Sequence, residues 1–174
     1  AGVAVHDFVK LDSVALKNAV PTAEGAVAEA VFDSPVQIQG SRCLVTGVGR
    51  CGSVLAEKLK LWSAKVTAAA RNKEQRALAE SFGIKAVSLD ELKEELSQAD
   101  FIFNTIPAMI LDRERLEQVK KEALIVDIAS APGGVDFMAA DELGIKAKQC
   151  LGIPGKYAAC SAAAILTETM ITEW

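Results

Sequence analysis

Three glycines in the segment LVTGVGRCG, residues 44–52, follow the spacing G-x-G-x-x-G. In a dinucleotide site, the first glycine (Gly47) makes a tight turn, the second (Gly49) lets the backbone approach a pyrophosphate, and the third (Gly52) lets the next helix lie close to the sheet. The predicted phosphate site also includes the other residues of this loop, Val48, Arg50 and Cys51. Because glycine is common, a structural turn that binds nothing is the alternative, and the surrounding elements must decide between the two.

The segment AAARNK, residues 68–73, follows at the distance where a dinucleotide site contacts the adenosine ribose. An NAD site usually has Asp or Glu here, which binds the ribose 2′-hydroxyl. This sequence has Ala70 and then Arg71, whose guanidinium suits a 2′-phosphate. We therefore predict NADP as the cofactor, with Asn72 and Arg76 completing this end of the site. The alternative is that Arg71 is only a solvated loop residue.

A polar pair, Asn104 and Thr105, lies late in another apolar run, and Ile106 and Pro107 follow it. Ligands of parallel α/β sheets bind beyond the carboxyl ends of the strands. We expect these four residues to form a wall around the nicotinamide ribose. Loop architecture without a ligand is the alternative interpretation.

Asp127 is an acid within ALIVDIA, residues 123–129, the most apolar run that we predict as a strand. A buried carboxylate is costly unless it is hydrogen-bonded, so we expect Asp127 to order nearby N–H groups and, with Ala129, to border the cofactor. The loop that follows is backbone-rich, and it contributes three residues to the predicted substrate site: Ser130, Gly133 and Gly134.

From residue 41 onward, apolar runs alternate with segments of helical periodicity. The predicted strands are 42–46, 65–70, 84–87, 100–105, 123–129 and 145–149. The predicted helices are 50–62, 73–82, 89–96, 113–119, 135–143 and 158–171. Gly83 is expected to end one helix, Ser88 and Glu91 to form a capping box, and Asp112 to cap another helix. This alternation predicts an α/β fold with a Rossmann-like, doubly wound parallel sheet of about six strands.

The first forty residues do not follow this alternation. Residues 3–8 have the pattern of a strand, and residues 20–32 that of a helix capped by Thr22. We therefore divide the chain into a linker segment with an interdomain helix at 1–40 and an NADP-binding Rossmann domain at 41–174. Because the chain does not start with Met, we expect it to begin inside a longer protein, with the helix arriving from a preceding domain.

Composition excludes several classes of function. The net charge of −4 gives no basic face for nucleic acid. The apolar runs are shorter than the roughly 18 residues of a membrane span, and no signal peptide is present, so we expect a cytoplasmic protein. No pair of the four cysteines forms C-x-x-C, so reduced thiols are expected. His6 is the only histidine, so no metal site is predicted.

Taken together, these loops resemble the family formed by the A subunits of dipicolinate synthase from spore-forming bacteria. The matching elements span most of the chain: NAVPTAEGA at 18–26, GVGRCG at 47–52, AAR at 69–71, NTIPAMIL at 104–111, DIASAPGGVDF at 127–137 and LGIPGKYA at 151–158. The pair of NTIP and DIASAPGG is far more specific than the glycine spacing. This sequence departs from the family after LGIPGKYA, where the family has Pro and then a Thr-Ala-Gly-like run. Residues 159–163 here read ACSAA, and the Ser161 hydroxyl takes the place of the threonine hydroxyl.

The resemblance implies oxidation of a dihydro- or hydroxytetrahydro-dipicolinate to dipicolinate with a nicotinamide cofactor. It further implies a flavoprotein-like partner, the B subunit, and action in the mother-cell cytoplasm. A homo-oligomer is also compatible with the sequence. The family places the linker helix and the LGIPGKYA loop at the substrate cleft, where Thr22 offers a hydroxyl and Lys156 and Arg50 offer charges to a small dicarboxylate.

No residue of the sequence can be identified as the general base, so the catalytic residues are unknown. Two alternatives stay open. One is another two-domain NAD(P)-dependent dehydrogenase, for a 2-hydroxy acid or a shikimate-like substrate; the former enzymes use a late histidine, and none follows His6 here. The other is a non-catalytic nucleotide-binding module, which turnover measurements would separate from both enzymes.

Overall fold

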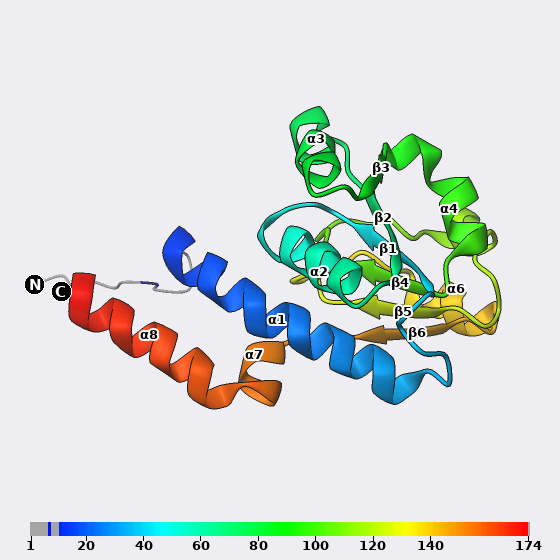
Figure 1. Cartoon of the computed structure of the whole chain (residues 1–174). Coiled ribbons are helices and arrows are strands. Elements are labelled where there is room, and N and C mark those ends of the chain that lie inside the picture. The colour runs from blue at the N-terminus through cyan, green and yellow to red at the C-terminus, as the bar shows by residue number, and fades with distance from the viewer. Residues whose placement is uncertain (1–6, 8–10, 174) are drawn as a thin grey trace, which may run out of the picture.

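The computed structural model describes residue 7 and residues 11–173, and its centre is one parallel sheet (Figure 1). Its six strands are arranged in the order β3-β2-β1-β4-β5-β6, and every neighbouring pair is parallel. The strands are β1 (Arg42–Thr46), β2 (Lys65–Ala69), β3 (Lys85–Val87), β4 (Phe101–Asn104), β5 (Leu124–Asp127) and β6 (Lys146–Gln149). This is the strand order of a doubly wound dinucleotide-binding fold, so the predicted fold class is confirmed.

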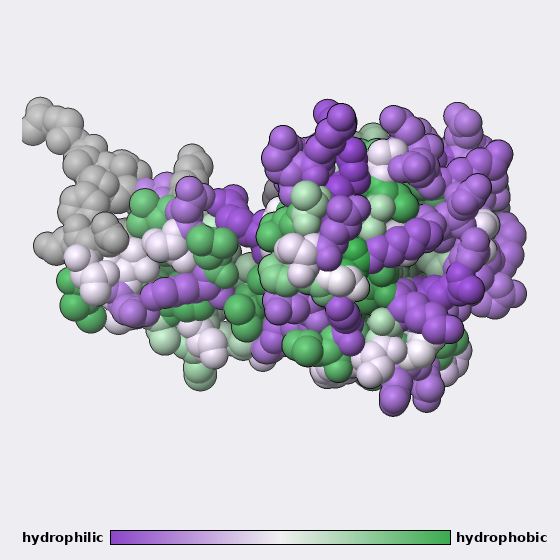
Figure 2. Space-filling view, turned by 45° about the horizontal axis from the view of Figure 1, so that its top comes forward, coloured by the Kyte–Doolittle hydropathy of each residue, from purple (hydrophilic) through white to green (hydrophobic). Residues whose placement is uncertain are grey.

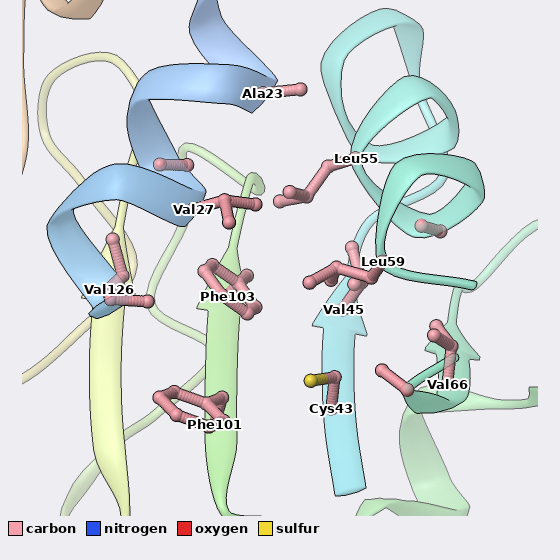
Figure 3. Close-up of a cluster of buried hydrophobic side chains, with 14 of the residues drawn as sticks. Ala23, Val27, Cys43, Val45, Leu55, Leu59, Val66, Phe101, Phe103 and Val126 are labelled. Carbon is pink, nitrogen blue, oxygen red and sulfur yellow. The ribbon is translucent and has the colours of Figure 1, made fainter. Parts of the chain in front are cut away.

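Helices cover both faces of the sheet (Figure 1). They are α1 (Asp12–Asp33), α2 (Arg50–Leu61), α3 (Lys73–Ser81), η2 (Leu89–Glu91), α4 (Leu92–Gln98), α5 (Arg113–Leu116), α6 (Phe137–Glu142), α7 (Ile153–Tyr157) and α8 (Ala159–Glu173). The helices α1, α2 and α3 pack on one face, and α4, α5 and α6 on the other. Figure 3 shows side chains of α1, α2 and the central strands meeting in the first of these cores, among them Ala23, Val27, Leu55, Leu59, Val45 and Phe103.

Three of the predicted helix signals, at Gly83, Ser88–Glu91 and Asp112, are confirmed. Gly83 has a positive φ of 65° directly after the end of α3. Both hydrogen bonds of the Ser88–Glu91 capping box are present, and the Asp112 side chain accepts from the backbone N–H of Arg115 at 3.0 Å. Each of these contacts satisfies polar groups that a helix end leaves free, which is why short helices begin and end at these residues.

Helix α1 differs most from the prediction. It begins at Asp12 rather than at residue 20 and runs through Pro21, so Thr22 lies in its interior and is not its N-cap. The Thr22 hydroxyl instead donates to the backbone oxygen of Asn18 at 2.6 Å. The helix continues through the proline because buried alanines on either side, Ala19 and Ala23, pack it closely on the domain.

Other differences concern the ends of the chain and the shorter elements. The sequence predicted a loop at 151–158, whereas the structure has the helix α7 at Ile153–Tyr157. The residue before it, Gly152, has a left-handed backbone conformation. The predicted strand at 3–8 lies outside the described residues, apart from residue 7. Helix α6 starts at Phe137, later than predicted, because Val135 pairs with Leu111 in an isolated bridge.

The first half of α1 and helix α8 project beyond the sheet as a pair (Figure 1). In Figure 2, polar side chains cover most of the sheet domain, and apolar patches are visible both there and on the projecting pair. None of the described helices has the length and apolar character needed to cross a bilayer.

Candidate functional site

The glycine loop joins β1 to α2 and has the geometry that its sequence motif requires. Gly47 adopts a φ of 91°, and a Cβ there would lie 2.4 Å from Oγ1 of Thr105. A Cβ at Gly52 would lie 2.0 Å from the backbone oxygen of Gly47, so the helix can approach the turn only without a side chain. A Cβ at Gly49 would have no atom within 4 Å, so this glycine faces open space. Its backbone is therefore accessible to a ligand.

The N-terminus of α2 is aimed at that same open space. Its N-cap residue, Gly49, provides no side-chain hydrogen bond to the first turn. The backbone N–H groups of this turn and the helix dipole therefore favour an anion at this position. The Arg50 side chain is half exposed and pairs with the carboxylate of Asp12, which lies at the start of α1.

A cavity of about 590 Å³ lies beyond the carboxyl ends of β1, β4, β5 and β6. It brings together eight of the residues predicted from the sequence: Thr22, Gly49, Arg50, Cys51, Thr105, Pro107, Ala129 and Ser130. A smaller hollow of about 250 Å³ lies at the opposite edge of the sheet, where the strands begin, and contains none of the predicted residues. Because ligands of such sheets bind at the carboxyl edge, we assign the functional site to the larger cavity.

The resemblance placed the linker helix and the LGIPGKYA segment at the cleft, but most residues of this outer wall were not named individually. The residues not named individually come from α1, from just after the end of β5 and from the segment that leads into α7: Ala15, Asn18, Ile128, Cys150, Leu151, Gly152, Ile153 and Pro154. The signal available in the sequence was the motif NAVPTAEGA, whose first residue is Asn18. Helical spacing then places Ala15, Asn18 and Thr22 on one face of α1.

A buried polar pair holds the loops beneath the cavity. Asn104 and Asp127 are both fully buried, and Nδ2 of the former donates to Oδ1 of the latter at 2.8 Å. Asn104 also accepts from the Thr46 hydroxyl at 2.6 Å. The Asp127 carboxylate accepts from the backbone N–H groups of Ala129 at 3.0 Å and Gly134 at 2.9 Å, so its predicted ordering role is confirmed. Neither side chain lines the cavity, so both support the loops from below.

Close packing at Gly134 and backbone conformation at Gly133 account for the two glycines of the loop after β5. A Cβ at Gly134 would lie 2.3 Å from Nδ2 of Asn104, and Gly133 has a positive φ of 82°. Neither residue lines the cavity, whereas the neighbouring Ser130 does. Of the polar pair predicted late in β4, Thr105 is the member that lines the cavity; Ile106 and the buried Val48 do not line it.

The predicted adenosine end lies at the carboxyl end of β2, outside the main cavity. Ala70 is buried and Arg71 is exposed. Asn72 caps α3 by accepting from the backbone N–H of Glu74 at 2.7 Å. Arg76 donates to the backbone oxygens of Ala70 at 2.7 Å and Arg71 at 2.8 Å. The side chains of Asn72 and Arg76 therefore hold the loop in place, and the Arg71 guanidinium is the exposed charge on this loop.

Lys156, predicted to bind substrate, is held instead by a buried acid of α1. Its Nζ lies 2.5 Å from Glu29, which is 2 % exposed and lies at the same distance from Lys148. Burial acts to raise the pKa of Glu29, but hydrogen bonds from Lys148, Lys156 and Tyr157 outweigh it and lower that pKa to about 2. Lys148 also contacts Asp33 at 2.7 Å. This cluster joins α1, β6 and α7 next to the cavity, and Lys156 does not line it.

Two thiols, Cys51 and Cys150, line the cavity. Burial raises the pKa of Cys51, and it raises that of Cys150 to about 11. Both groups are therefore neutral at physiological pH, which makes them poor nucleophiles. All four cysteines are free thiols, and the described residues contain no cluster of three or more His, Cys, Asp or Glu that could hold a metal.

Comparison with known proteins identifies the fold and its relatives. Residues 15–135 match the family described as D-isomer specific 2-hydroxyacid dehydrogenase, NAD binding domain. The A subunit of dipicolinate synthase from Bacillus subtilis (strain 168) is 37% identical over 98% of this chain, which spans 58% of that protein. The predicted resemblance is therefore confirmed.

Two solved structures extend this likeness to three dimensions. The crystal structure of the dipicolinate synthase A chain from Bacillus subtilis has a TM-score of 0.92 at 36% identity, covering 95% of this chain and 55% of that one. The corresponding protein from Bacillus halodurans has a TM-score of 0.94 at 32% identity, covering 96% and 57%. This chain thus spans little more than half the length of these relatives.

Proposed function

Because the chain belongs to the NAD-binding domain family of D-isomer specific 2-hydroxyacid dehydrogenases, we propose that it is the nucleotide-binding part of a dipicolinate-forming dehydrogenase. In this proposal, the whole protein oxidises a dihydro- or hydroxytetrahydro-dipicolinate to dipicolinate with NADP during spore formation. One observation carries it. A single cavity joins the glycine loop to Thr22 and the Leu151–Pro154 segment, which come from two motifs of the dipicolinate synthase resemblance.

The cavity residues suit a dinucleotide. Open space at Gly49 and the uncapped first turn of α2 provide the contacts that a pyrophosphate requires. A bound nicotinamide dinucleotide supplies the hydride acceptor. The residues of the chain bind and orient: Thr105 and Ser130 offer hydroxyls inside the cavity, and Arg50 offers a positive charge to a substrate carboxylate. We place the general base in the part of the relatives that this chain does not span.

We propose NADP as the preferred cofactor because of the loop after β2. Ala70 provides no carboxylate for a ribose 2′-hydroxyl, and a carboxylate there would repel a 2′-phosphate. Arg71 is exposed and flanks it, so its guanidinium can pair with that phosphate. Asn72 and Arg76 contribute by holding the loop in place.

The proposal extends to a partner and a compartment. The Bacillus subtilis relative is by its name one of the subunits of a synthase, which implies a second kind of chain, and we propose a flavoprotein-like B subunit. We further propose that the protein acts in the mother-cell cytoplasm and that it forms a homo-oligomer. Co-purification of the two kinds of chain from sporulating cells would test the first of these points.

The decisive experiment is a coupled reaction under anaerobic conditions. The intact protein is mixed with NADP⁺ and a running dihydrodipicolinate synthase reaction, and the ultraviolet absorbance of dipicolinate is followed together with NADPH. Equal rates of dipicolinate and NADPH formation are expected, both dependent on the protein. Dipicolinate formed at the rate of the protein-free control, with no NADPH, would reject the proposed reaction.

A further inference from the structure

One polar atom of the cavity wall has no partner. Among the described residues, the amide oxygen Oδ1 of Asn18 is the one buried side-chain nitrogen or oxygen atom without a hydrogen bond. Asn18 also lines the cavity. An unsatisfied acceptor in the interior costs free energy, and native structures rarely keep one without a reason. Asn18, the residue that carries this buried atom, lines a ligand cavity, which supplies such a reason.

The neighbouring groups are already engaged. The Thr22 hydroxyl donates to the backbone oxygen of Asn18 rather than to its side chain. Arg50, the nearby cation of the cavity, pairs with Asp12. The backbone N–H groups inside α1 are used in the helix itself. A donor for this oxygen therefore has to come from something that enters the cavity.

We propose that Asn18 is a ligand-recognition residue whose Oδ1 accepts a hydrogen bond from an O–H or N–H group of the molecule bound in this cavity. The inference rests on the proposed function only in locating a cofactor and a substrate there. Carboxylates and phosphates have no proton to donate at neutral pH, so neither is the group that Oδ1 recognises. The donor is neutral: the carboxamide N–H of a nicotinamide, or a hydroxyl or ring N–H of the substrate.

Asn18→Ala tests the proposal, with Val20→Ala as the matched control. Val20 lies on the same helix, is 42% exposed and does not line the cavity, so its replacement reproduces the gain in helix propensity alone. In the intact protein, three quantities are compared: the melting temperature without ligand, the Kd of NADPH by calorimetry, and the KM of the dipicolinate precursor at saturating NADP⁺.

We expect Asn18→Ala to melt no lower than the control, because it removes an acceptor that is unpaired in the free protein. We also expect either Kd or KM to rise by roughly three- to tenfold, the loss of one neutral hydrogen bond. A rise in Kd identifies the donor as part of the cofactor, and a rise in KM alone identifies it as part of the substrate. The control variant should change neither.

Unchanged Kd and KM would overturn the proposal. A lower melting temperature of Asn18→Ala would then mean that the residue is structural, and an unchanged melting temperature would mean that water satisfies its oxygen. If the wild-type protein binds NADPH but converts no precursor, the proposed reaction fails, and Kd alone decides: a rise supports Asn18, and no rise rejects it. The failure of the function and the failure of this inference therefore give different results.

Discussion

Glu29 offers the sharpest test of how α1 is fastened to the domain. Its carboxylate is 2 % exposed and contacts two ammonium groups at 2.5 Å, from Lys148 and Lys156. We consider the substitution Glu29→Gln, which keeps the size of the side chain and removes its charge. The matched control is Glu24→Gln on the same helix, because Glu24 also pairs with a lysine but its side chain is 59% exposed.

The magnitude follows from the pKa of Glu29, which falls from the ordinary 4.5 to about 2. At 1.36 kcal/mol for each pKa unit, this lowering corresponds to roughly 3 kcal/mol of stability at pH 7. Solvent partly screens the two lysines, whose side chains are 37% and 56% exposed, so we expect Glu29→Gln to cost about 2–3 kcal/mol. The exposed pair at Glu24 should contribute less than about 1 kcal/mol.

The assay is urea denaturation of wild type and both variants between pH 7 and pH 2. A lowered pKa in the folded state stabilises the protein above the unfolded pKa, and this stabilisation is lost as the pH falls through the folded pKa. The wild-type advantage over Glu29→Gln should therefore be complete at pH 7 and shrink between about pH 4.5 and pH 2. An advantage that stays constant over this interval, or one no larger than that over Glu24→Gln, would refute the reasoning.

Three further predictions concern the site itself. Arg71→Ala should weaken NADPH binding by roughly 1–3 kcal/mol and leave NADH nearly unchanged; equal losses in calorimetry would count against a 2′-phosphate contact. Gly52→Ala should destabilise the fold by roughly 1–3 kcal/mol, since its Cβ would lie 2.0 Å from a carbonyl oxygen, whereas Gly49→Ala should fold normally and bind dinucleotide roughly tenfold more weakly. Similar urea midpoints for the two glycine variants would contradict this. Thr22→Val should lower kcat/KM for substrate by about tenfold with NADPH affinity unchanged, because Thr22 lines the cavity; a loss of melting temperature alone would mean that Thr22 is architectural.

Local patterns predicted the parts of the fold that local physics determines. The strands of the sheet are short apolar runs, and the caps at Ser88 and Asp112 are specified within three residues of sequence. The glycine loop could be located because its conformation leaves few other residues allowed at Gly47 and Gly52. Asp127 could also be recognised as a buried acid that orders N–H groups, because a carboxylate late in an apolar strand requires hydrogen bonds.

Contacts between distant segments could not be predicted. Lys156 has the same appearance in sequence whether it binds a ligand or Glu29, which lies 127 positions earlier. Thr22 suggested a helix start, because threonine is a common N-cap, yet α1 begins at Asp12 and tertiary packing carries it through Pro21. Asn18 drew no attention because its unsatisfied oxygen is a property of the folded environment alone.

Helix α1 connects the two halves of the proposed site. One of its faces carries Asn18 and Thr22 at the cavity, then Gly25, then Glu29. A Cβ at Gly25 would lie 2.2 Å from the side chain of Ile153, so α1 and α7 are in direct contact there and only glycine fits. Because Glu29 holds the far end of α7 through Lys156, the cavity wall made by Asn18 and Ile153 is fixed from both sides. The sheet thus positions a nucleotide, while α1 and α7 set the shape of what lies next to it.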